Sequence, residues 1–90
     1  GEYVITRHAD NERRNDGLST EDIEDVLSGS QILEEYPEDR RGRSCLVLGW
    51  HGNRPVHVVC GANTDGWLVI ITVYIPMPPK WISATERRSK

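Results

Sequence analysis

The hydrophobic pattern changes its period after Gly29, and this change constrains the fold more than any other feature of the 90 residues. Beyond it, apolar residues alternate with polar ones in four short runs, QILEEY (31–36), SCLVLGW (44–50), PVHVVCG (55–61) and WLVIITVY (67–74). A period of two is typical of half-buried strands. The connections HGNR and NTDG have hairpin length and contain the Gly, Asn and Asp residues that tight turns need. The pattern predicts a mainly antiparallel four-stranded sheet whose last three strands form a meander.

Two helical segments precede the strands. Residues 6–16 are expected to form a polar helix with Thr6 as its N-cap. The second segment, GLSTEDIEDVLSG, has Ser19 and Asp22 at the spacing of a capping box, which predicts a helix over about 20–28. Helices that come before a meander give two layers. The expected fold class is therefore α+β, with two N-terminal helices packed on one face of the four-stranded sheet.

Hairpin parity decides which side chains share a face of this sheet, because directly paired residues point to the same side. His57 falls opposite or diagonal to Thr72 and Tyr74, so these three residues are expected on one face. The other face is expected to carry the helices and to collect the small and β-branched residues Cys45, Val47, Val56, Val58, Cys60, Val69, Ile71 and Val73.

Size and charge limit what the chain can be. Ninety residues are enough for one core, so residues 1–82 are expected to form a single domain and residues 83–90 a flexible C-terminal tail. The longest apolar run has the length of a strand, so we expect no membrane span and a cytoplasmic location. The formal net charge of −3 argues against a general polyanion binder, and nucleic acid is expected to bind only at a focused site.

Cys45 and Cys60 are the two cysteines of the chain, and parity puts them opposite each other on neighbouring strands. A cross-strand disulfide would be strained there, and a reducing compartment would keep both thiols free. Reduced, buried thiols are therefore the expected state.

His57, with a hydroxyl and a phenol as neighbours, is the candidate centre of a site. The alternative reading is structural, since a half-buried histidine can simply hydrogen-bond Tyr74 or Thr72. His57 and Cys60 lie three residues apart on a strand and so point to opposite faces, where they could not share a metal ion. No metal and no cofactor are expected.

Three arginines, Arg40, Arg41 and Arg43, lie in the loop PEDRRGRS that leads into the second strand. Most arginine clusters of this kind are simply exposed to solvent in a loop. If the loop curls over the sheet, however, the planar guanidinium groups could each bind two phosphate oxygens beside His57.

Five segments, taken in order, point to a family. ITRHADNERR, GLSTEDIEDVLSG, EEYPEDRRGRSCLVLG, RPVHVV and VIITVYIP with a following tryptophan resemble the bacterial domain-of-unknown-function 4258 family. That family looks like a relative of the RelE, MqsR and BrnT toxins, small α+β ribonucleases that an antitoxin neutralises. The resemblance implies a RelE-like architecture and a metal-independent endoribonuclease of the mRNA interferase type. The implied partners are RNA or ribosome-bound mRNA and a cognate antitoxin protein, with no membrane and no direct DNA binding.

The resemblance also implies roles for individual residues. His57 would act either as the base that deprotonates the attacking 2′-hydroxyl or as the acid that protonates the departing 5′-oxygen. Tyr74 or His8 would take the other of these two roles, and an arginine of the 40–43 loop would stabilise the charge on the phosphoryl oxygens. His8 would contribute only if the first helix packs its N-terminal end beside the face that carries His57. The implied catalytic residues are His57, Tyr74, His8 and Arg41, and the implied substrate-binding residues are Arg40, Arg43 and Thr72.

Two other functions compete with this one. A catalytically inactive protein-interaction module of the same fold is the alternative, because Trp50, Trp67 and Trp81 are many large aromatic residues for a small domain and such residues often anchor interfaces. A small-molecule enzyme ranks last, since the chain has no nucleotide loop, nucleophile motif or paired catalytic carboxylates.

Overall fold

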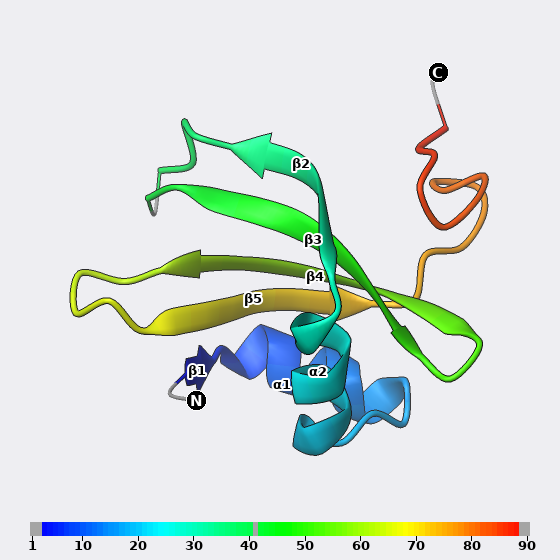
Figure 1. Cartoon of the computed structure of the whole chain (residues 1–90), viewed down its shortest axis with the longest axis horizontal. Coiled ribbons are helices and arrows are strands. Elements are labelled where there is room, and N and C mark those ends of the chain that lie inside the picture. Colours follow the sequence, from blue (N-terminus) through cyan, green and yellow to red (C-terminus); the bar gives the residue numbers. More distant parts are fainter. Residues whose placement is uncertain (1–2, 41, 89–90) are drawn as a thin grey trace.

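The computed structural model describes residues 3–40 and 42–88, which form two helices and one sheet (Figure 1). Along the chain the elements are β1 (Tyr3–Ile5), α1 (Arg7–Asn15), α2 (Thr20–Ser28), β2 (Gln31–Tyr36), β3 (Ser44–His51), β4 (Arg54–Ala62) and β5 (Leu68–Tyr74). The strands lie in the order β1-β5-β4-β3-β2. Among the described residues, no helix has the length and apolar character that crossing a membrane requires.

The sheet is five-stranded and mixed, so the expectation of a four-stranded, mainly antiparallel sheet is wrong. Strand β1 pairs in parallel with β5, Tyr3 opposite Leu68 and Ile5 opposite Ile70. The pairs among β2, β3, β4 and β5 are antiparallel. A strand of three residues directly before a helix N-cap is too short to show an alternating pattern. Its pairing with a distant strand is a tertiary contact that the local sequence does not encode.

Both predicted helices are confirmed, together with the residues that start them. The hydroxyl of Thr6 accepts a hydrogen bond from the backbone N–H of Ala9 at 3.0 Å. In the second helix the backbone N–H of Asp22 donates to the hydroxyl of Ser19 at 3.0 Å, and the N–H of Ser19 donates to the Asp22 carboxylate at 2.9 Å. Each cap satisfies backbone N–H groups that the first turn of a helix leaves without partners.

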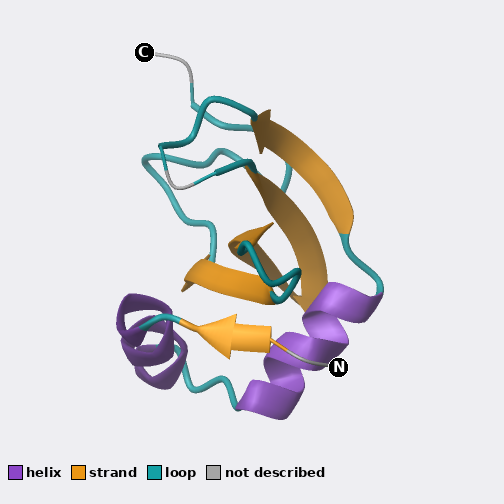
Figure 2. Cartoon of the chain, turned by 90° about the vertical axis from the view of Figure 1, so that its left-hand side faces the viewer, coloured by secondary structure: helices purple, strands orange, loops and turns teal. Residues whose placement is uncertain are grey.

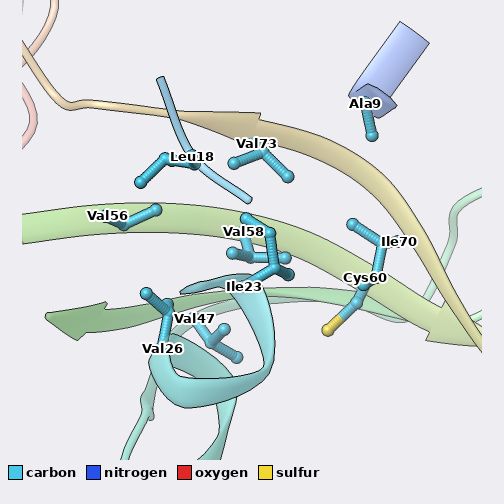
Figure 3. Packing of buried hydrophobic residues seen from close by; sticks show 10 residues of the cluster. All are labelled: Ala9, Leu18, Ile23, Val26, Val47, Val56, Val58, Cys60, Ile70 and Val73. Atoms are coloured by element: carbon cyan, nitrogen blue, oxygen red, sulfur yellow. The ribbon is translucent and has the colours of Figure 1, made fainter. Parts of the chain in front are cut away.

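The main core lies between the helices and one face of the sheet (Figure 3). It consists of Ala9, Leu18, Ile23, Val26, Val47, Val56, Val58, Cys60, Ile70 and Val73. Helix α2 approaches this face closely at Gly49, where a Cβ would lie 2.1 Å from the carbonyl oxygen of Val26. Glycine at this position therefore allows the α2 backbone to contact strand β3.

A β-bulge shifts the register of β5 relative to the simple hairpin alternation. Val59 pairs with Thr72, but the next residue, Cys60, pairs with Ile70. The extra residue is Ile71. Because of it, the side chains of β5 before Ile71 point to the opposite face of the sheet from the one that simple alternation predicts. As a result Ile70 is fully buried in the main core, whereas Val69 and Ile71 leave the core face to which parity assigned them.

After β5 the chain crosses to the sheet face opposite the helices, where residues 76–88 form what we call the C-terminal segment (Figure 2). Trp81 is buried in this segment, at 2% exposure. The backbone of Trp81 forms a bridge with that of Arg87. The sequence predicts a flexible tail over residues 83–90, but Ala84 and Arg87 are hydrogen-bonded to His57 and Glu34 of the sheet. Residues 89 and 90 lie outside the described part.

Candidate functional site

The face of the sheet opposite the helices carries a second, smaller buried group. Leu46, Leu48 and His57 point to this face by strand alternation, and Leu48 lies directly opposite His57. Their exposures are 0%, 3% and 0%. The C-terminal segment provides their cover, since Trp81 packs edge-on against His57 with ring centroids 4.3 Å apart. The predicted site histidine is therefore enclosed between the sheet and the C-terminal segment.

Both ring nitrogens of His57 have hydrogen-bond partners. Nε2 lies 2.6 Å from the carbonyl oxygen of Ala84, and Nδ1 lies 3.1 Å from the hydroxyl of Tyr74. A carbonyl can only accept, so Nε2 must carry the proton that it donates to Ala84. Burial lowers the pKa of His57, so the ring is neutral near pH 7 and Nδ1 accepts from the Tyr74 hydroxyl. The bond to Ala84 thus fixes one tautomer of the ring.

A second set of polar groups lies beside His57. Arg87 donates to both carboxylate oxygens of Glu34, through Nε at 3.1 Å and Nη2 at 2.7 Å. The Tyr36 hydroxyl donates to the same carboxylate. The hydrogen bond from Arg87 holds the pKa of Glu34 below its ordinary value, while burial raises the pKa of Tyr36 to about 12. Arg87 also stacks over the ring of Trp81, with its guanidinium carbon 4.6 Å from the ring centroid.

These contacts join two strands, the end of β5 and the C-terminal segment into one group, which we call the covered cluster. Its members are Glu34, Tyr36, His57, Tyr74, Trp81, Ala84 and Arg87. Burial raises the pKa of Tyr74, so its phenol stays protonated at neutral pH. The cluster contains a neutral histidine, two phenols, a carboxylate and a guanidinium, which together can accept protons, donate protons and bind an anion.

The arginine loop lies directly before β3, at the opposite end of the β3–β4 pair from His57. Ser44 begins β3 and His57 lies opposite Leu48, so the loop is separated from His57 by four residues of strand, about 13 Å. Arg40 and Arg43 are exposed to solvent. Arg43 lines a hollow of about 120 Å³ there. Arg41 lies outside the described residues.

His8 and Thr72 occupy different surroundings. Thr72 is half-buried and pairs with Val59, which puts it on the same face as His57. His8 lies on α1, in the helix layer, where its side chain is 68% exposed and its Nε2 is 3.3 Å from the Glu12 carboxylate. The structure therefore brings Thr72, but not His8, to the face of His57. A role for His8 required the N-terminal end of α1 to pack beside the face that carries His57, and it does not.

Metal binding requires several ligands in one place. Within residues 3–40 and 42–88 no group of three or more His, Cys, Asp or Glu side chains is arranged to hold a metal ion. The covered cluster itself offers one carboxylate, already bound by Arg87, and one histidine whose nitrogens are both engaged.

Sequence reasoning missed the C-terminal half of the covered cluster. Glu34 and Tyr36 alternate correctly to share a face, and that signal was available in QILEEY. Trp81 is the largest apolar residue of the proline-containing stretch after β5, and it was a visible candidate anchor. No local pattern, however, linked Arg87 to Glu34, because the two residues are 53 positions apart.

Comparison with known proteins gives one match. The model of a family described as a domain of unknown function (DUF4258) matches residues 5–75, which is more than three quarters of the chain. The match includes His57 and Tyr74 and ends before Trp81, Ala84 and Arg87. The searches of curated proteins and of solved structures found no match. The chain belongs to the domain-of-unknown-function 4258 family.

Proposed function

We propose that this chain is a toxin-like, metal-independent endoribonuclease of a bacterial toxin–antitoxin module, with the covered cluster as its site. One observation carries the proposal: His57 is neutral and hydrogen-bonded to the Tyr74 phenol on the sheet face opposite the helices. A neutral imidazole can accept a proton, and a protonated phenol can donate one. The resemblance of the five sequence segments to RelE, MqsR and BrnT toxins supports the same reaction class.

In the proposed reaction, the 2′-hydroxyl of RNA attacks the adjacent phosphorus and the 5′-oxygen leaves. His57 takes the proton of the attacking hydroxyl, and Tyr74 gives a proton to the leaving oxygen. An arginine of the 40–43 loop binds a phosphate further along the RNA, since the loop is about 13 Å of strand away from His57. The products are a 2′,3′-cyclic phosphate and a free 5′-hydroxyl. Because the chain is acidic overall, binding depends on this local site rather than on general attraction to RNA.

The C-terminal segment closes the proposed site. Nε2 of His57 donates a hydrogen bond to the Ala84 carbonyl, and the Arg87 guanidinium donates one to the Glu34 carboxylate. Neither group is therefore free to bind RNA in this conformation. RNA can reach these groups only after the segment moves away. We therefore propose that the closed conformation is the inactive state, and that the active state has the segment displaced from the sheet.

RNA cleavage in the presence of EDTA tests the proposal. Single-stranded oligonucleotides of mixed sequence are incubated with the wild-type chain, with His57→Gln and with Tyr74→Phe, and fragment ends are identified by mass spectrometry. Tyr74→Phe keeps the ring and removes only the hydroxyl, and circular dichroism verifies that both variants are folded. The proposal expects cyclic-phosphate ends from the wild type and at least about a hundredfold slower cleavage by each variant. Equal rates for the wild type and His57→Gln would remove His57 from the mechanism.

A catalytically inactive interaction module is the second candidate, and the complete burial of His57 favours it. A ring with both nitrogens engaged is what a structural histidine requires. Exposed Trp50 and Trp67, at 51% and 42%, would then be partner contacts. In this case none of the three chains cleaves RNA, and Trp50→Ala weakens binding to the product of an adjacent small reading frame.

A further inference from the structure

Cys45 and Cys60 lie outside the covered cluster, on the helix-bearing face of the sheet. They are direct partners across β3 and β4, and both are free thiols. Cα atoms of directly opposed residues in an antiparallel pair are about 4.5–5.5 Å apart, which is within the range that a disulfide spans. The Cys45 thiol also contributes to the raised pKa of Cys60, as expected of a close neighbour. The strand register therefore already holds the two side chains side by side on one face of the sheet.

The surroundings of the two thiols are unequal. Cys60 is 6% exposed and belongs to the main core, whereas Cys45 is half-buried. Both line a shallow hollow of about 210 Å³, with Arg43 and the exposed Glu35 at its margin. Burial raises the pKa of the Cys60 thiol to about 12, and the neighbouring Cys45 contributes to the rise. A small oxidant can thus enter beside Cys45, while Cys60 is a poor first nucleophile.

We propose that Cys45 and Cys60 are a peroxide-sensitive modification site that closes reversibly into a cross-strand disulfide. The Cys45 thiolate attacks one oxygen of hydrogen peroxide, so that an S–O bond forms, the O–O bond breaks and the departing hydroxide takes up a proton to become water. Cys60 then loses its proton and attacks the sulfenic sulfur of Cys45. An S–S bond forms, the S–O bond breaks and a second water leaves. The two thiols lose two electrons, and the peroxide gains them.

Reversibility follows from the position of the pair. Cys45 is half-buried beside the hollow, and a disulfide that a thiol reductant can reach is reduced more readily than a fully buried one. Thiol reductants should therefore restore both cysteines. The site is independent of RNA cleavage, because the two side chains point away from the face that carries His57.

The reduced chain is treated with hydrogen peroxide, and its thiols are counted by alkylation and intact mass. Having two cysteines only, the chain gives an unambiguous result. The proposal expects both thiols to be lost together in a monomer that is lighter by two hydrogen atoms, with both recovered by dithiothreitol. In Cys60→Ser, Cys45 should stop at a sulfenic acid that dimedone traps, and in Cys45→Ser, Cys60 should react at least about tenfold more slowly. Disulfide-linked dimers, direct overoxidation of Cys45 to the sulfinic acid or thiols that survive peroxide in the folded chain would each overturn it.

Discussion

Replacing Trp81 by alanine tests how the C-terminal segment is held. Trp81 is 2% exposed and contacts His57 and Arg87. Deleting a buried tryptophan side chain typically costs about 3–5 kcal/mol. Residues 76–88 lie beyond the last strand, however, so the segment can undock while the rest of the domain stays folded. The loss therefore cannot exceed the free energy that docks the segment.

Three contacts hold the segment: the buried Trp81 side chain, the bond from His57 to the Ala84 carbonyl, and the half-exposed pair of Arg87 with Glu34. The Trp81 contact is the largest, because the indole ring buries the most apolar surface. We expect Trp81→Ala to lower the free energy of unfolding by about 3 kcal/mol, the low end of the range for a buried tryptophan, which a domain of this size survives.

Urea unfolding followed by far-UV circular dichroism measures this loss, and an NMR titration of the imidazole signals measures the second effect. Once the segment is released, His57 becomes hydrated and its pKa should rise towards about 6.5. Trp50→Ala is the matched control, because Trp50 is a tryptophan of β3 that is 51% exposed, whereas Trp81 is 2% exposed. It should cost about 1 kcal/mol or less and leave the pKa of His57 lowered. Equal losses for both variants, with the pKa of His57 unchanged in each, would refute the docking of Trp81.

Three further predictions concern the rest of the structure. The pKa of His57 is lower in the folded chain than in the unfolded chain, so the wild type loses stability as the pH falls below about 6.5. His57→Gln removes this titration, so its free energy of unfolding should fall less over the same pH range. Urea unfolding at several pH values measures the difference. A double-mutant cycle of Arg87→Ala and Glu34→Gln should give a coupling of only about 0.5–1 kcal/mol, because both side chains are partly exposed; a coupling near zero would mean that the pair does not form in solution. Gly49→Ala should destabilise by at least about 2 kcal/mol because its Cβ would meet the backbone of α2, whereas Gly29→Ala, with open space around it, should change thermal stability little.

The elements that sequence reasoning predicted well are those encoded by adjacent residues. Thr6, Ser19 and Asp22 start their helices through bonds spanning three residues, so the signal is complete within one turn. The turns between β3 and β4 and between β4 and β5 are likewise local. Strand β1 could not be predicted in this way, because its pairing with β5 depends on residues more than sixty positions away. The bulge at Ile71 could not be predicted either, since the alternation of apolar and polar residues gives no sign of an inserted residue.

The candidate site shows the same division. Hairpin parity predicts that His57 shares a face with Tyr74 and Thr72, one of them directly opposite, and the structure pairs it with Tyr74. This prediction needs only the register of two neighbouring strands. The contacts of Ala84 and Arg87 depend on how the chain returns after three prolines, and no periodicity describes that path. For this reason the sequence indicated a histidine on an accessible face, whereas the structure has a histidine beneath the C-terminal segment.

Cleavage of single-stranded RNA in EDTA by Trp81→Ala, compared with the wild-type chain, tests the account most directly. If docking is worth about 3 kcal/mol, roughly one wild-type molecule in 150 is open, so releasing the segment should raise the cleavage rate by about a hundredfold. Adding His57→Gln to Trp81→Ala should remove that gain. A released segment, shown by the risen pKa of His57, with no RNA cleavage above the buffer control would contradict the proposed ribonuclease site.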